Sequence, residues 1–283
     1  MPVRNETLDF FDQVDESEIV ENHINSVLKL EETQARALLS KYREIRGDLR
    51  DRLDSVKSGT FTAQQIRGVL AQVDAAIIAM NSSLKDGIVE GAEKSALRGV
   101  EDLLSEIRKF SQMFGGAVTP INLNVALVAQ DAANFRINQY ESSLDAYSEQ
   151  LRSQITTQIA NASLEQITMN ELTGRMSKFF LGEEWKLTQI ARTELHGVYN
   201  LGKMASMEEV QENYLSDLKK TLIHPMDGRT GADSKALARQ NPIVDIDKPF
   251  IQKWNGKTYT FMAPPNRPND RAILVPYRKA WDE

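Results

Sequence analysis

The stretch 62-TAQQIRGVLAQVDAAIIAM-80 carries the pattern that decides most of the fold. Its apolar residues recur at alternating steps of three and four, which places them on one face of an α-helix. Thr62 and Gln65 have the spacing of a capping box, which marks the start of such a helix. The stripe consists of Ile66, Leu70, Val73, Ile77, Met80 and Leu84. It predicts a long helix with one buried face.

Similar stripes lie on both sides of this stretch. Toward the N-terminus the apolar residues are Leu38, Tyr42, Ile45, Leu49, Leu53 and Val56. Toward the C-terminus they are Ile137, Tyr140, Leu144, Tyr147, Leu151, Ile155 and Ile159. One interpretation is the core of a helix bundle. The other is a set of helices that complete their burial against partner proteins, and periodicity alone leaves both open.

The intervening segment changes phase. Ile88, Ala92, Ala96 and Val100 follow steps of four alone, which would disturb a regular coiled-coil seam. Helix boundaries are indicated by a capping box at Asp15 and Glu18, by the glycines 59, 115 and 116, and by Pro120. Two shorter helices are expected near 169–180, opened by Thr168 with Glu171, and near 183–213.

Composition changes after residue 213. Seven of the nine prolines lie after residue 214, and Lys and Arg outnumber Asp and Glu by 12 to 8 there, against 22 to 32 before it. Proline is unfavourable inside helices, so the helical part ends here. The expected regions are 1–115, with long helices, 116–213, also helical, and 214–283, a small α+β module.

The last region shows strand signals. Asn255 and Gly256 lie between two apolar runs and predict a type I′ hairpin. The segments 219-KKTLIH-224 and 272-AILVPY-277 supply further strands, and a short helix is expected near 233–240. The fold class is therefore mainly α: a long helical N-terminal bundle or arm, followed by a small α+β C-terminal module with a short mixed sheet of three or four strands and a hairpin.

Several classes of site are excluded or disfavoured. The chain has no cysteine, which excludes disulfides and thiolate metal sites. Its net charge of −6 gives no general attraction to nucleic acid or to an anionic membrane. The N-terminus has no apolar signal region and no run of about 18 apolar residues occurs, so neither a standard signal peptide nor a membrane span is expected. Motifs for nucleotide binding and hydrolysis are missing from the sequence.

A metal site is one interpretation of the acidic residues in the last region. His224, Asp227, Asp233 and Asp270 offer oxygen and nitrogen ligands, and a metal-dependent hydrolase or nuclease would use His224, Asp227 and Asp270. The segment from Asp227 to Thr230 is more simply a turn, in which the aspartate accepts hydrogen bonds and Gly228 supplies an unusual φ. We expect the turn, with no metal and no cofactor.

The segment 190-IARTELHGVYN-200 places Arg192, His196 and Tyr199 on one face of a helix. A catalytic interpretation makes His196 a base oriented by Glu194 or Arg192. Glu194 and His196 are two residues apart, however, and cannot face each other on a helix. Ion pairs of Arg192 and Glu194 at a helix contact are the favoured interpretation, so no catalytic residue is expected.

A basic surface with an aromatic residue is a candidate contact for DNA or a partner protein. Lysine and arginine would bind phosphates, and the aromatic ring would stack on a base. A solvated surface is the alternative. The residues are Lys248, Lys253, Trp254, Lys257, Arg267, Arg278 and Lys279.

Three segments in order resemble the bacteriophage Mu F-like head morphogenesis family, which comprises minor head proteins of tailed phages. They are 191-ARTE-194, 227-DGRTGADSKAL-237 and 264-PPNRPNDR-271, and the resemblance covers about residues 130 to 281. The positions that match the family motifs are Arg192, Thr193, Glu194, Asp227, Arg229, Thr230, Pro264, Pro265, Asn269 and Arg271. Where many members carry cysteine, this chain has Asp270 and Ala272.

The resemblance implies a non-enzymatic minor capsid protein of the virion. Such a protein lies inside the head near the portal vertex, after assembly in the host cytoplasm, and assists head assembly, DNA packaging or DNA ejection. The implied partners are the portal protein, with scaffold or major capsid protein and packaged double-stranded DNA as further ones, and several copies per virion are expected. No membrane is involved during assembly.

The proline-rich stretch 264-PPNRPNDR-271 must keep its shape without cysteine. Proline fixes φ and lacks an N–H donor, which favours a rigid turn before the last strand. We expect Asp270 or Asn269 to bond backbone amides in this turn, and Arg271 to pair with an acid such as Asp227.

Overall fold

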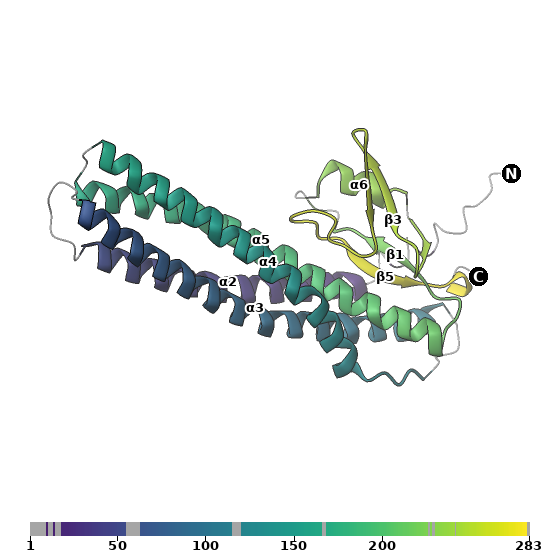
Figure 1. The fold of residues 1–283 in the computed structure, drawn as a ribbon. Helices are drawn as coiled ribbons and strands as arrows, with labels where there is room; N and C mark the ends of the chain where they lie inside the picture. The colour runs from purple at the N-terminus through teal and green to yellow at the C-terminus, as the bar shows by residue number, and fades with distance from the viewer. Residues whose placement is uncertain are drawn as a thin grey trace. The chain divides into compact units, whose positions relative to one another are not determined.

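A computed structural model describes Phe10, Val14 and residues 18–54, 63–114, 120–165, 168–225, 227, 230–240 and 242–281. Four long helices come first and short strands follow, so the expected fold class is confirmed (Figure 1). The helices are α2 (Glu18–Asp54), α3 (Ala63–Met113), α4 (Val125–Leu164), α5 (Met169–Asn213) and α6 (Ala232–Ala238). The strands are β1 (Lys219–Ile223), β2 (Val244–Asp245), β3 (Phe250–Trp254), β4 (Lys257–Phe261) and β5 (Ile273–Tyr277), followed by the 3-10 turn η1 (Lys279–Trp281). None of the described helices is long and apolar enough to cross a membrane.

The start of α5 has the expected capping box. The Thr168 backbone N–H donates to Glu171 Oε2 (2.9 Å), and the Glu171 N–H donates to Thr168 Oγ1 (3.3 Å). The division of this region into two helices is wrong, because α5 runs without a break through Gly182. A glycine costs a helix interior only about 1 kcal/mol, and the buried side chains on either side, Phe180 and Leu187, hold the helix together. The boundary residues Asp15, Gly59, Thr62, Gly115 and Gly116 lie outside the described residues.

The chain packs into two compact units, and each long helix contributes a segment to both. One unit comprises residues 1–32, 91–136 and 192–283; the other comprises 33–90 and 137–191. Composition favours the consecutive regions 1–115, 116–213 and 214–283, whereas packing groups residues that are distant in sequence.

The unit of residues 33–90 and 137–191 buries most of the described side chains of the predicted stripes in one core, whereas Val56 and the side chains of Leu49, Leu53, Ile66 and Tyr140 lie outside the description. Leu38, Leu84, Leu144 and Ile155 are each at most 2 % exposed. The Tyr42 hydroxyl donates to the Phe180 carbonyl oxygen (3.1 Å), so this polar group is paired inside the core. Within this unit the described residues of the stripes pack against the chain's own helices, as in the bundle interpretation.

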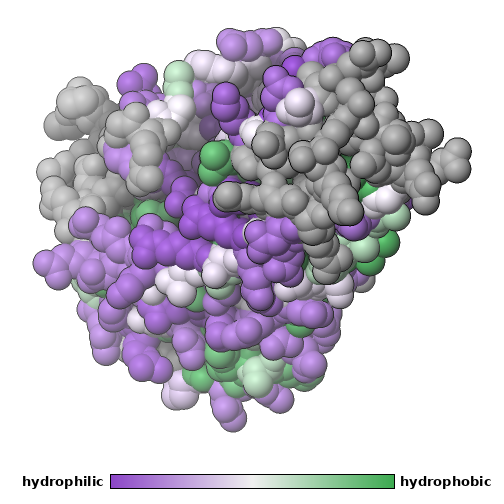
Figure 2. Space-filling model, turned by 90° about the vertical axis from the view of Figure 1, so that its left-hand side faces the viewer, coloured by the Kyte–Doolittle hydropathy of each residue, from purple (hydrophilic) through white to green (hydrophobic). Residues whose placement is uncertain are grey.

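Large apolar side chains that remain exposed in this unit are few among its described residues: Ile78, Leu181 and Trp185. Leu181 and Trp185 are four residues apart on α5 and therefore neighbours on one helix face. The described surface shown in Figure 2 is mostly hydrophilic, with apolar residues in small separate areas.

In the other unit, α3 and α5 approach each other closely where both carry small residues. A Cβ atom at Gly99 would overlap the Tyr199 carbonyl oxygen, and one at Gly202 would overlap the Ala96 carbonyl oxygen. Ala92 and Ala96 are fully buried here. The steps of four in this part of the sequence thus mark a close helix crossing.

The strands form two antiparallel sheets, where a mixed sheet of three or four strands was expected. One has the order β2-β1-β5, and the other is the β3–β4 hairpin. The hairpin turns at Asn255 (φ 48°) and Gly256 (φ 74°), and two positive φ values are what a type I′ turn requires. The hairpin, the strands β1 and β5 and the short helix α6 are confirmed.

A buried lysine ties β1 to two loops of the same unit. Lys220 Nζ donates to the carbonyl oxygens of Ile246 (2.8 Å) and Met262 (3.0 Å). Burial lowers the pKa of Lys220 to about 8, although the Glu208 carboxylate opposes this shift. The ammonium group therefore serves as a structural donor.

Candidate functional site

The segment 191-ARTE-194 lies in the C-terminal half of α5 and contacts two other parts of its unit. Glu194 is buried and accepts a hydrogen bond from Arg136 Nε (2.8 Å). Thr193 Oγ1 accepts from the backbone N–H of Asn269 (3.1 Å) in the proline-rich turn. The predicted ion pair of Glu194 is thus confirmed. Arg192 is exposed and has no ion-pair partner among the described residues, so the ion pair expected for it is not formed within this part of the chain.

The proline-rich turn is held by Asp270. Its Oδ2 accepts from the Asn266 N–H (3.1 Å) and its Oδ1 from the Ala272 N–H (3.2 Å). Asn269 adopts φ 61°, and the bond between Pro264 and Pro265 is cis. The expectation that Asp270 or Asn269 bonds backbone amides is confirmed for the Asp270 side chain.

The segment from Asp227 to Thr230 joins the same turn through an ion pair. Arg271 donates from Nη1 to Asp227 Oδ2 (2.8 Å) and from Nη2 to Asp227 Oδ1 (2.6 Å), which confirms the expected pair. The Thr230 N–H donates to the Asp227 carbonyl oxygen (3.2 Å), as in a turn. Arg229 and Gly228 lie outside the described residues. Three segments that are far apart in sequence therefore meet at one place.

His196 anchors this place to the start of β5 and to α2. Its Nδ1 lies 2.7 Å from Glu31 Oε1, and its Nε2 lies 2.6 Å from the Ala272 carbonyl oxygen. A carbonyl or carboxylate oxygen can only accept, so both ring nitrogens carry protons and the ring is an imidazolium. Burial alone would lower the pKa of His196, but the charge and hydrogen bond of Glu31 outweigh burial and raise it.

Asn200 completes the attachment of β5. Its Oδ1 accepts from the Leu274 N–H (2.7 Å), and its Nδ2 donates to the Ala272 carbonyl oxygen (3.3 Å). Sequence reasoning missed the role of Asn200 and the pairing of His196 with Glu31. The available signal was a set of polar residues on a helix face that is otherwise apolar.

The stability of the protein should depend on the charge of His196. In the unfolded chain a histidine titrates near about pH 6.5. Since folding raises the pKa of His196, its ion pair stabilises fully below that pH and is lost as the pH rises through the folded value. Urea unfolding measured at several pH values above about 6.5 checks this. The free energy of unfolding should fall with rising pH in the parent, and it should fall less in His196→Gln.

His224 supplies a control of opposite sign. Burial lowers the pKa of His224, although the Asp270 carboxylate opposes this. Its contribution to stability is therefore lost as the pH falls below about 6.5. His224→Gln should flatten the acidic side of the profile only. A His196→Gln profile parallel to that of the parent above pH 6.5 would contradict the imidazolium assignment.

The three aspartates among the proposed metal ligands are each engaged by protein groups. Asp227 pairs with Arg271, Asp233 with Arg267, and Asp270 accepts from backbone amides. Among the described residues, no three His, Asp or Glu side chains form a group that could hold a metal ion. His224 is buried, and its Nε2 has no hydrogen-bond partner in the described part of the chain.

Three of the candidate basic residues are neutralised by acids. Arg267 Nη2 donates to Asp233 Oδ1 (2.9 Å), Lys248 Nζ to Asp247 Oδ2 (2.8 Å) and Arg278 Nε to Asp217 Oδ1 (2.9 Å). Such pairs reduce the charge available for phosphate contacts.

Four candidates remain. Lys253, Trp254 and Lys257 lie together on the β3–β4 hairpin, where Trp254 is opposite Lys257. Lys279 lies in η1. The hairpin is therefore the part of the candidate surface that is free to contact a partner.

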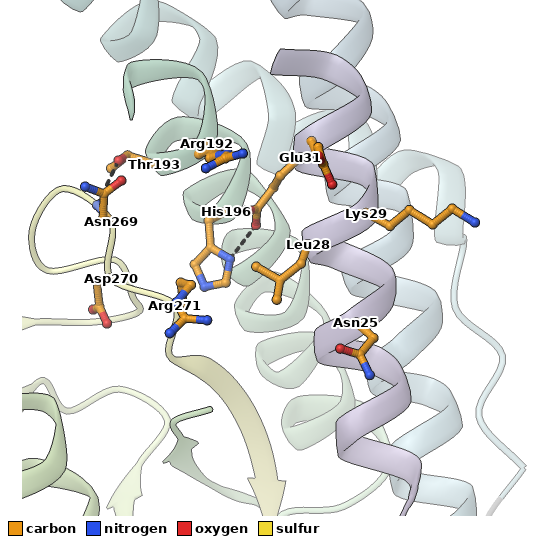
Figure 3. Close-up of a pocket in the computed structure, with 11 residues that line it drawn as sticks. Asn25, Leu28, Lys29, Glu31, Arg192, Thr193, His196, Asn269, Asp270 and Arg271 are labelled. Carbon is orange, nitrogen blue, oxygen red and sulfur yellow. Dashed lines mark hydrogen bonds and ion pairs between the residues drawn. The ribbon is translucent and has the colours of Figure 1, made fainter. Parts of the chain in front are cut away.

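A cleft of about 560 Å³ opens beside His196, between α2, α5 and the proline-rich turn. Figure 3 shows Thr193 and Asn269 close together at one side and the imidazole of His196 directed at Glu31. The lining residues are Asn25, Leu28, Lys29, Glu31, Glu32, Arg192, Thr193, His196, Asn269, Asp270 and Arg271. Leu28 is the one purely apolar side chain among these lining residues, so a ligand of this cleft must be polar.

Comparison with protein-family models, with curated proteins and with solved structures finds no significant match to this chain.

Proposed function

We propose that this chain is a non-enzymatic minor head protein of a tailed bacteriophage, which acts inside the head near the portal vertex during head assembly, DNA packaging or DNA ejection. The proposal begins from the motif order described above, which resembles the Mu F-like head morphogenesis family. In this proposal the portal protein is the main partner, and scaffold, major capsid protein or packaged DNA are further contacts.

The observation that carries the proposal is the convergence of the motif segments. Thr193 of the first segment bonds Asn269 of the third (3.1 Å), and Arg271 of the third pairs with Asp227 of the second. Segments that match a family only by chance have no reason to meet in the fold. Their convergence supports a shared module whose motifs are structural.

A structural role for the motifs also supports a protein without catalysis. The Asp227 and Asp270 side chains accept hydrogen bonds that close turns or attach Arg271, and His196 attaches β5. A general base needs a proton acceptor free to reach a substrate. The His196 imidazolium has both nitrogens in use, so it offers none.

The portal contact is assigned to exposed apolar side chains. Aromatic residues and leucine that are exposed on a soluble protein commonly mark interaction surfaces. Leu181 and Trp185 are 59 % and 60 % exposed and lie on one face of α5. They therefore offer a helical partner two neighbouring apolar side chains on one helix face.

Quantitative mass spectrometry of gradient-purified virions tests the proposal. The chain should be present in full heads at a small fraction of the copy number of the major capsid protein. Detection in the lysate together with its absence from the particles would contradict the proposal. A control that removes loosely bound protein with high salt should leave the particle-associated chain in place.

A further inference from the structure

The acidic residues that line the cleft beside His196 contribute less free negative charge than their number indicates. Glu31 is neutralised by the imidazolium of His196 (2.7 Å). Asp270 directs both carboxylate oxygens at backbone amides of its own turn. Lys29 and Glu32, which also line the cleft, already have interaction partners. The acidic residues of the lining are thus occupied by the protein itself.

Arg192 is the cation that remains. It lines the cleft from α5, it is exposed, and within the described part of the chain it has neither an ion pair nor a hydrogen bond from its side chain. Figure 3 shows its guanidinium above the imidazole of His196. A guanidinium presents a planar set of N–H donors that fits a carboxylate or a phosphate with two parallel hydrogen bonds.

Neutral donors line the same cleft, although Figure 3 shows Asn25, on α2, well away from the guanidinium. The side-chain amides of Asn25 and Asn269 line the same cleft, and neither makes a hydrogen bond among the described residues. Thr193 contributes a hydroxyl group whose oxygen already accepts from the Asn269 N–H. Each amide offers two N–H donors to an oxygen-rich ligand.

We propose that this cleft binds an oxyanion, either a carboxylate or a phosphate, with Arg192 as its anchor and Asn269 as a supporting donor. The volume of about 560 Å³ lies in the ordinary range for small-molecule sites. Among the described residues that line it there is no Phe, Tyr or Trp on which a nucleobase could stack. The ligand is therefore a small polar anion or an acidic group of a larger molecule, whether or not the chain is a head protein.

Isothermal titration of the full-length chain with two separate probes, inorganic phosphate and glutarate, tests the proposal. Ionic strength is held constant with potassium chloride, because a change in salt concentration would by itself alter the attraction between exposed charges and the probe. We expect saturable binding of at least one probe to the parent. Arg192→Ala should weaken it about tenfold or more, since hydrogen bonds to charged groups are among the strongest. Arg192→Lys should fall between the two, because it keeps the charge and loses the planar donor set.

The matched control is Lys253→Ala, which removes an exposed cation on the β3–β4 hairpin and should bind as the parent does. Circular dichroism and the unfolding midpoint establish that each variant is folded. Binding of glutarate alone would identify a carboxylate site and binding of phosphate alone a phosphate site. Failure of both probes to bind the parent, or equal affinity in Arg192→Ala, Arg192→Lys and the parent, would overturn the proposal. The measurement uses purified protein, so its outcome is separate from the presence of the chain in virions.

Discussion

Replacing Gly202 or Gly99 by alanine should destabilise the protein by about 3 kcal/mol, the upper range for overpacking a core. Alanine is normally the better helix former by about 1 kcal/mol, so the expected change has the opposite sign to helix propensity. The reason is geometric, because each new Cβ would overlap a backbone carbonyl oxygen of the facing helix, that of Ala96 or of Tyr199. A backbone atom cannot move aside without displacing the whole helix. Chemical denaturation, compared at equal pH and salt, measures the difference.

The control for this prediction lies on the same helix as Gly202. Gly182 is exposed within α5, and a Cβ atom there would have no heavy atom within 4 Å. Gly182→Ala should therefore stabilise the protein by about 0.5–1 kcal/mol. Stabilisation by Gly202→Ala and Gly99→Ala as well would show that α3 and α5 do not cross closely.

Replacing Lys203 by methionine should cost about 3 kcal/mol or more. Lys203 and Glu106 are both fully buried, and Lys203 Nζ donates to Glu106 Oε1 (2.5 Å). Removal of the lysine leaves the Glu106 carboxylate buried without its main positive partner. Breaking a buried ion pair typically costs about 3–5 kcal/mol. His23 Nδ1 contacts the same carboxylate oxygen (2.8 Å), which keeps the expected cost at the lower end.

Two comparisons make this prediction specific. The double variant Lys203→Met with Glu106→Leu removes both charges and should recover part of the lost stability. Lys85→Met breaks an exposed pair with Asp145 (2.9 Å) and should cost less than about 1 kcal/mol. If Lys203→Met cost no more than Lys85→Met, the buried network would not be a significant source of stability.

Local patterns predicted the parts of the fold that depend on neighbours in sequence. The three-and-four spacing placed Leu38, Leu84 and Leu144 in a core, because helical geometry alone puts such residues on one face. The Asn255-Gly256 hairpin followed from the positive φ that its turn demands. These features need no knowledge of what lies across the fold.

The contacts of the candidate site depend on the tertiary fold, and the sequence could not supply most of them. Glu31 and His196 are 165 residues apart, and no periodicity relates them. The steps of four near Ala96 signalled a change of packing but not its partner, Gly202. The pair of Arg271 with Asp227 was predicted because both belong to short motifs in one small module.

The ion pairs of the basic surface could not be predicted from the sequence either. Lys and Arg in sequence say nothing of the acids that neutralise them, and Arg278 pairs with Asp217, which is 61 residues earlier. The remaining free cations on the hairpin, Lys253 and Lys257, are too few to predict strong binding to DNA, since each phosphate contact adds a small, salt-sensitive increment. In the proposed head function, a protein partner is therefore favoured over DNA.

An asymmetric cryo-electron reconstruction of the portal vertex tests the proposed head function most directly. Particles that contain the chain would be compared with particles assembled without it. The proposal predicts difference density inside the head, at the portal, that accommodates four long helices and a small β module. Difference density elsewhere in the particle, or identical portal vertices in the two samples, would contradict it.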